Sequence, residues 1–119
     1  MVGMSMNPSP PVSVYEVSPR DGLQNETVVL PTEVKVELIS RLIAAGVKDI
    51  EVTSFVRPSW IPQLADASEV VARLPHTDGV NFWGLIPNRR GLDRAIDGGA
   101  GRHEHGADNL EGDAPHGRL

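Results

Sequence analysis

The feature that most constrains the fold is a regular alternation of strand-like and helix-like segments. Short runs of alternating apolar and polar residues, rich in β-branched side chains, cover 12–17, 48–53 and 80–86. Between and after them, apolar residues recur at helical spacing over 31–45, 65–74 and from 91 onward. Strands and helices that alternate in this way form parallel sheets with right-handed crossovers. The sequence therefore predicts an α/β chain, either an open sheet or part of a barrel.

The first helix has the clearest boundaries. Its expected start is Pro31, and Gly46 is expected to end it as a left-handed cap. The residues that share its predicted apolar face are Val34, Leu38, Ile39, Leu42 and Ile43. Trp60 and Trp83 are expected to be packing groups rather than platforms for a ligand.

The length limits how much of a barrel is present. A complete eight-unit barrel needs about 200 residues or more, and this chain has 119. We therefore expect a partial TIM barrel of about three βα units over 12–100, with a disordered leader at 1–11 and a polar, disordered tail at 101–119. The change to Gly-rich polar sequence after residue 98, where a fourth strand is due, is typical of a truncated or frameshifted chain. Three parallel strands would leave an open sheet edge.

Composition excludes several classes of function. The formal charge of -5 argues against nucleic-acid binding, which depends on clustered basic residues. No apolar run approaches the roughly 20 residues of a membrane span. The absence of cysteine excludes disulfides and thiolate chemistry, and it fits a reducing, cytoplasmic compartment.

Arg20 and Asp21 follow the first predicted strand directly, and Glu51 lies within the second. In α/β folds the functional loops follow the carboxyl ends of the strands. By itself, a Pro-Arg-Asp-Gly run is also an ordinary solvated turn, and a strand glutamate usually faces solvent.

Four motifs decide between these interpretations. They are Val17-Ser18-Pro19-Arg20-Asp21-Gly22-Leu23-Gln24-Asn25-Glu26, Ile50-Glu51-Val52-Thr53-Ser54-Phe55-Val56, Trp60-Ile61-Pro62-Gln63 and Leu85-Ile86-Pro87-Asn88. In this order and spacing they resemble the amino-terminal part of the hydroxymethylglutaryl-CoA lyases, which belong to the pyruvate carboxyltransferase-like metallolyase barrels. The resemblance runs from about residue 12 to about residue 100. Leu23 stands where the related condensing synthases have an acidic residue, which favours a lyase.

The resemblance implies a carbon–carbon lyase that uses Mg²⁺ or Mn²⁺ to cleave 3-hydroxy-3-methylglutaryl-CoA into acetoacetate and acetyl-CoA. It assigns Asp21 as a metal ligand, and a carboxylate suits such hard cations. Arg20 would stabilise the enolate oxygen as a catalytic and substrate-binding residue. Glu51 would act catalytically by orienting Arg20, and Gln24 would bind substrate. The implied partner is an acyl-CoA, and full-length relatives are expected to be homo-oligomers.

The same resemblance implies that parts of the site are absent. Complete members supply a histidine pair, an asparagine and a cysteine from later segments, and no position here matches them. His103 and His105 lie in the polar tail, where we expect at most adventitious metal binding. The chain is therefore predicted to be inactive alone, with the metal weakly held.

Two other interpretations remain open. One is a non-catalytic interaction module or subunit that completes its sheet with a partner, and the other is an acyl-CoA condensing synthase of the same superfamily. Arg89-Arg90 carry the right charge for a CoA phosphate, but two basic residues after a turn are usually hydrated. We therefore do not assign them to the site.

Overall fold

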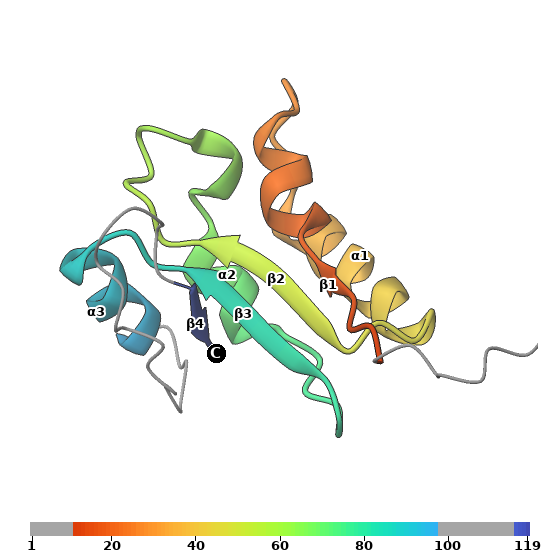
Figure 1. Cartoon of the computed structure of the whole chain (residues 1–119). Coiled ribbons are helices and arrows are strands. Elements are labelled where there is room, and N and C mark those ends of the chain that lie inside the picture. The colour runs from red at the N-terminus through yellow and green to blue at the C-terminus, as the bar shows by residue number, and fades with distance from the viewer. Residues whose placement is uncertain (1–10, 98–115) are drawn as a thin grey trace, which may run out of the picture.

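The computed structural model describes residues 11–97 and 116–119, which form an α/β fold around one four-stranded sheet (Figure 1). The strand order is β1 (Tyr15–Glu16), β2 (Asp49–Ser54), β3 (Asn81–Leu85) and β4 (His116–Arg118). The first three strands are parallel, and β4 pairs antiparallel with β3. The predicted order of strands and helices is confirmed.

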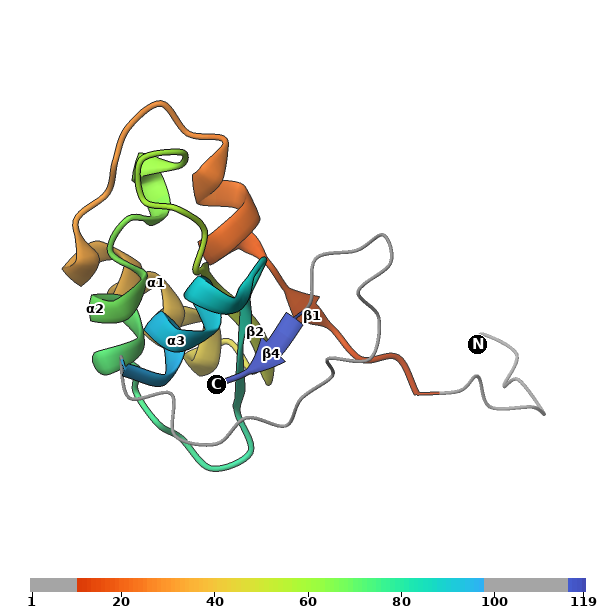
Figure 2. The ribbon, with the colours of Figure 1, turned by 90° about the vertical axis from the view of Figure 1, so that its left-hand side faces the viewer.

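Three helices cover one face of the sheet, as the rotated view in Figure 2 shows. They are α1 (Thr32–Ala44), α2 (Ala67–Ala72) and α3 (Arg89–Asp97), and a short 3-10 helix, Pro62–Leu64, precedes α2. The core lies between this face and the helices, and its largest members include Ile39, Ile50, Val52, Phe55, Val70 and Phe82. Within the described residues, no helix has the length and apolar character needed to cross a membrane.

The end of α1 follows the prediction. Gly46 has φ +96°, which only glycine adopts without strain. The N–H of Gly46 donates to the carbonyl of Ile43 at 3.0 Å, and that of Val47 donates to the carbonyl of Leu42 at 3.1 Å. These two bonds form a Schellman motif, and Leu42 and Val47 both pack against the core.

The predicted apolar face of α1 is wrong in one respect. Val34 is exposed, and Lys35 is buried in its place. The Nζ of Lys35 donates to the Asp66 carboxylate at 2.5 Å and also to the carbonyl of Gln63. Because the partners lie about 30 residues further along the chain, helical periodicity could not identify this buried cation.

The first strand is shorter than predicted. It spans Tyr15–Glu16 rather than 12–17, and Val12 and Val14 are exposed. Tyr15 pairs with Asp49, the first residue of β2, so the residues before Tyr15 have no opposing strand in the sheet.

The end of the chain differs from the predicted polar tail. Residues His116–Arg118 form β4, and the N–H of Leu119 donates to the carbonyl of Phe82 at 2.7 Å. The Leu119 side chain packs against the core. The edge of β3 that was expected to be open is therefore covered by β4. Most of the expected leader and tail, including His103 and His105, lies outside the described residues.

The other face of the sheet carries polar and aromatic side chains. Residues paired side by side in a sheet point to the same face, and the pairs on this face are Tyr15 with Asp49, Asp49 with Asn81, and Glu51 with Trp83. The register of β2 against β3 shifts directly after Glu51, which is a β-bulge. Such irregularities often lie next to functional residues.

Candidate functional site

Glu51 is the centre of the candidate site. Its side chain is 0% exposed although it is an acid. It accepts hydrogen bonds from the side chains of Arg20 and Tyr15. The Nε of Arg20 donates to Oε1 at 2.5 Å, and the hydroxyl of Tyr15 donates to Oε2 at 2.6 Å. A buried carboxylate is tolerated when it is paired and hydrogen-bonded in this way. The predicted association of Arg20 with Glu51 is therefore present.

The backbone after β1 positions Arg20. The sequence predicted a turn here, and the structure has a π-helical turn, Ser18–Gly22, in which Pro19 is buried. The N–H groups of Arg20 and Asp21 both donate to the carbonyl of Val17, at 3.1 and 2.7 Å. Single π-helical turns are rare and occur frequently at functional sites. This turn directs the Arg20 side chain back toward β2.

Asp21 has a different environment from Glu51. Its side chain is 53% exposed, and its Oδ1 accepts from the Nη1 of Arg20 at 3.3 Å. Arg20, whose side chain is 17% exposed, thus lies between a buried carboxylate and a solvent-accessible one. The buried Glu51 can therefore orient the Arg20 guanidinium, while the exposed Asp21 remains able to bind a solute.

Tyr15 belongs to the same cluster, although the sequence analysis did not assign it. Burial, followed by its hydrogen bond to the Glu51 carboxylate, raises the pKa of Tyr15 far above its ordinary value of 10.0. Tyr15 therefore remains a protonated donor to Glu51 at neutral pH.

Asp49 extends the cluster toward β3 and was also missed. Its Oδ1 accepts from the Nδ2 of Asn81 and the Nε1 of Trp83, each at 3.1 Å. The ring of Trp83 meets that of Tyr15 edge to face, with centroids 5.9 Å apart.

Trp83 is thus a packing group, as predicted, whereas Trp60 is 73% exposed and is not. The i, i+2 spacing of Asp49 and Glu51 was a usable signal, because it places both on one face.

Gln24 and the expected metal site have fewer contacts among the described residues than Arg20 and Glu51 have. Gln24 is half-buried one helical turn beyond Arg20, and its side chain makes no hydrogen bond to another described residue. Within residues 11–97 and 116–119, no three histidine, aspartate or glutamate side chains gather in a way that could hold a metal ion. The exposed carboxylate of Asp21 fits one ligand position of a hard cation, and the described residues supply no full set.

Curated proteins similar in sequence to this chain are hydroxymethylglutaryl-CoA lyases. The chain is 51% identical over 89 residues to the mitochondrial hydroxymethylglutaryl-CoA lyase of Arabidopsis thaliana. These aligned residues are 75% of this chain and 19% of that protein. It is 48% identical over 89 residues to the cytoplasmic 3-hydroxy-3-methylglutaryl-CoA lyase of Rattus norvegicus, covering 75% of this chain and 26% of that protein.

Solved structures show the same similarity. The fold matches the HMG-CoA lyase of Bacillus subtilis with a TM-score of 0.70 and 49% identity, over 74% of this chain and 30% of that one. It also matches an Acinetobacter baumannii HMG-CoA lyase, solved with coenzyme A and 3-methylmalate, with a TM-score of 0.71 and 44% identity, over 74% of this chain and 29% of that one. These matches confirm the predicted partial TIM barrel. The chain spans about a fifth to three tenths of the length of these relatives. Residues 11–105, well over half of the chain, match the model of the HMGL-like family. This chain therefore belongs to the HMGL-like family.

Proposed function

We propose that this chain supplies the first part of a hydroxymethylglutaryl-CoA lyase site, in which Arg20, Asp21, Gln24 and Glu51 take part in cleaving 3-hydroxy-3-methylglutaryl-CoA. In that reaction the hydroxyl proton is removed, the carbon–carbon bond breaks, and acetoacetate leaves as the ketone. The bonding electrons pass to the acetyl-CoA fragment as an enolate, which is then protonated. The observation that carries the proposal is the 2.5 Å contact between Arg20 and the buried Glu51 in a chain of this family.

Arg20 is the proposed donor to the enolate oxygen. Its Nε is held by Glu51 and its Nη1 contacts Asp21, so its Nη2 group has no partner among the described residues. A guanidinium held on one side presents its remaining N–H groups in a fixed direction, and it stays protonated through the reaction. Preorganised donors of this kind stabilise developing oxyanions most effectively, because they need no reorganisation.

Asp21 is the proposed ligand of a divalent cation, Mg²⁺ or Mn²⁺. When bound, such a cation would polarise the substrate's hydroxyl and carboxylate oxygens. The solvent exposure of Asp21 supports this role, since a hard cation usually keeps several waters. Glu51 is the proposed positioning residue for Arg20, Tyr15 holds the second oxygen of Glu51, and Gln24 is the proposed hydrogen-bonding partner of the substrate.

The proposal is tested in a chimera, because the described residues lack a full set of metal ligands. Residues 12–97 of this chain would replace the matching segment of the Bacillus subtilis lyase, and acetoacetate formation would be measured with Mg²⁺ or Mn²⁺. The chimera should cleave hydroxymethylglutaryl-CoA, and Arg20→Gln in it should lower kcat about 10²- to 10³-fold. Asp21→Asn should raise the metal concentration needed for half-maximal activity.

A matched control is Arg41→Gln, since Arg41 lies on the surface of α1 in an exposed ion pair with Glu37. This variant should leave kcat unchanged. A folded chimera without lyase activity would contradict the substrate assignment, and an unchanged kcat in Arg20→Gln would contradict the role of Arg20. The chain alone is expected to form no acetoacetate. The cytoplasmic location stays a prediction, because the similar lyases include both mitochondrial and cytoplasmic proteins.

A further inference from the structure

One strand of the sheet runs against the other three. β4 pairs antiparallel with the outer edge of β3, and Figure 1 shows it beside that strand. The register places Trp83 opposite Arg118, Gly84 opposite Gly117 and Leu85 opposite His116. Residues 98–115 separate α3 from β4 in the sequence, and β4 does not continue the parallel order of the preceding strands. It is a short strand added to the edge of a parallel three-stranded sheet.

Gly84 provides the space that receives the side chain of Leu119. Gly84 is buried in β3, and a Cβ placed on it would lie 3.3 Å from both methyl carbons of Leu119 and 3.6 Å from its Cγ. The N–H of Leu119 donates to the carbonyl of Phe82 at 2.7 Å, and the Leu119 side chain packs against the core. A glycine inside a strand often marks a place where another group approaches closely. Backbone pairing and one apolar side chain therefore hold this segment on β3.

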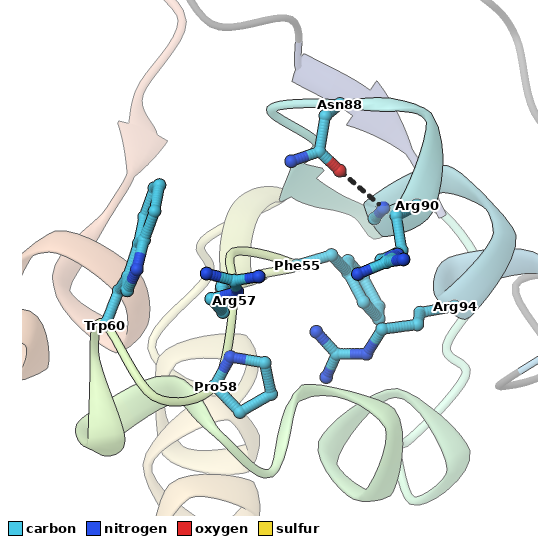
Figure 3. Close-up of a pocket in the computed structure, with 8 residues that line it drawn as sticks. Phe55, Arg57, Pro58, Trp60, Asn88, Arg90 and Arg94 are labelled. Carbon is cyan, nitrogen blue, oxygen red and sulfur yellow. Dashed lines mark hydrogen bonds between the residues drawn. The ribbon is translucent and has the colours of Figure 1, made fainter.

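The surroundings of this edge are held in place by contacts elsewhere. The N–H of Gly91 donates to the Oδ1 of Asn88 at 2.8 Å, which fixes the start of α3 just after β3 (dashed line in Figure 3). A Cβ on Gly91 would lie 2.5 Å from the carbonyl oxygen of Phe55, so glycine lets α3 pack against the end of β2. On its other side, β3 pairs with β2 along its whole length. These contacts involve none of residues 116–119, so they can hold the edge of β3 in place without that segment.

The contact between β4 and β3 is small. β4 has three residues, fewer than the five or six of an average strand. Arg118 and Leu119 both remain partly exposed. Bringing a segment back to the sheet across residues 98–115 also costs loop-closure entropy, which the few hydrogen bonds of β4 must offset. A segment held in this way exchanges between a bound and a released state.

We propose that the edge of β3 is a docking site for an extended peptide strand, and that residues 116–119 occupy it as an exchangeable internal ligand. The partner that fits this site is an extended segment that pairs antiparallel with β3. It has a small residue opposite Gly84 and, two positions later, an apolar side chain that fills the space beside Gly84. Strand addition of this kind takes its affinity from main-chain hydrogen bonds and its specificity from alternate side chains. While the internal segment is bound, it closes this edge to any other strand.

The test uses a fluorescent peptide with the sequence of residues 111–119, whose binding to the full 119-residue chain is followed by fluorescence anisotropy. In Leu119→Asp the internal segment is weakened, because a carboxylate does not enter the apolar space beside Gly84, while β3 itself is unchanged. The peptide should bind this variant about tenfold or more tightly than the unmodified chain. The internal segment competes in the unmodified chain, and apparent affinity falls with the fraction of open sites.

Two control variants locate the effect. Val28→Asp, an exposed apolar residue in the loop before α1, should bind the peptide as the unmodified chain does. Gly84→Val in the Leu119→Asp chain should abolish peptide binding, because the new side chain fills the space that the leucine of the peptide needs. A measurement on the unmodified chain needs no variant: saturating peptide should speed hydrogen exchange of the Leu119 N–H, which is bonded to the Phe82 carbonyl.

Equal peptide binding by the unmodified chain and Leu119→Asp would overturn the proposal, as would the absence of binding by both. Peptide binding that survives Gly84→Val would place the peptide away from β3 and contradict the assigned site. An unchanged exchange rate of the Leu119 N–H at saturating peptide would show that the internal segment is not displaced. Because these assays involve no cleavage of an acyl-CoA, their outcome is independent of the proposed function.

Discussion

Replacing Glu51 with glutamine tests whether a charged carboxylate organises the candidate site. Glutamine has nearly the same shape, so it leaves no cavity, and its carbonyl oxygen can still accept from Arg20. What is lost is the negative charge between Arg20 and the hydroxyl of Tyr15. The expected result of Glu51→Gln is a less stable fold with a more mobile Arg20.

The magnitude follows from the geometry. A hydrogen bond to a charged group contributes about 1.5–3 kcal/mol, and removing one partner of a fully buried pair costs about 3–5 kcal/mol. Arg20 retains 17% exposure and can still contact Asp21, so the uncompensated charge is partly solvated. We therefore expect Glu51→Gln to lower the free energy of unfolding by about 2 kcal/mol.

Chemical denaturation followed by tryptophan fluorescence measures this difference. Asp21→Asn is the matched control, because its 3.3 Å contact with Arg20 is exposed and should contribute less than about 1 kcal/mol. If the two variants unfold at the same denaturant concentration as the unmodified chain, the Arg20–Glu51 contact does not stabilise the fold, and the reasoning fails.

Three further predictions concern other parts of the structure. Because burial raises the pKa of Tyr15 above 10.0 in the folded state, its contribution to stability should be complete below pH 10 and decline as the pH rises beyond it. Tyr15 is the only tyrosine, so tyrosinate absorbance follows it directly, and titration near pH 10 in the folded chain would contradict the buried site. Gly91→Ala should destabilise by about 1–3 kcal/mol in thermal unfolding, because its Cβ meets the Phe55 carbonyl, whereas Gly22→Ala, with ordinary contacts, should cost nothing measurable. Leu119→Ala should destabilise by about 1–2 kcal/mol, since this side chain is half-buried against the core, and an unchanged denaturation midpoint would refute the packing of β4.

Local sequence patterns were sufficient to predict the alternating strands and helices and the position of Arg20 at the end of the first strand. Periodicity separates strands from helices because side chains repeat every 2 residues in a strand and every 3.6 in a helix. In a parallel sheet all carboxyl ends lie at one edge, so the position of Arg20 directly after a strand already indicated where it would lie. Gly46 was predictable for a similarly local reason, since a left-handed cap depends on its own backbone.

Which side chains contact one another depends on how distant parts of the chain pack together. Tyr15 joins the Glu51 cluster because the sheet places β1 beside β2, and Lys35 is buried because Asp66, the residue just before α2, reaches it. The exposure of Trp60 and the pairing of β4 with β3 likewise depend on neighbours that are distant in sequence. A polar side chain can be buried only where a partner from elsewhere in the chain satisfies it, and local patterns carry no information about that partner.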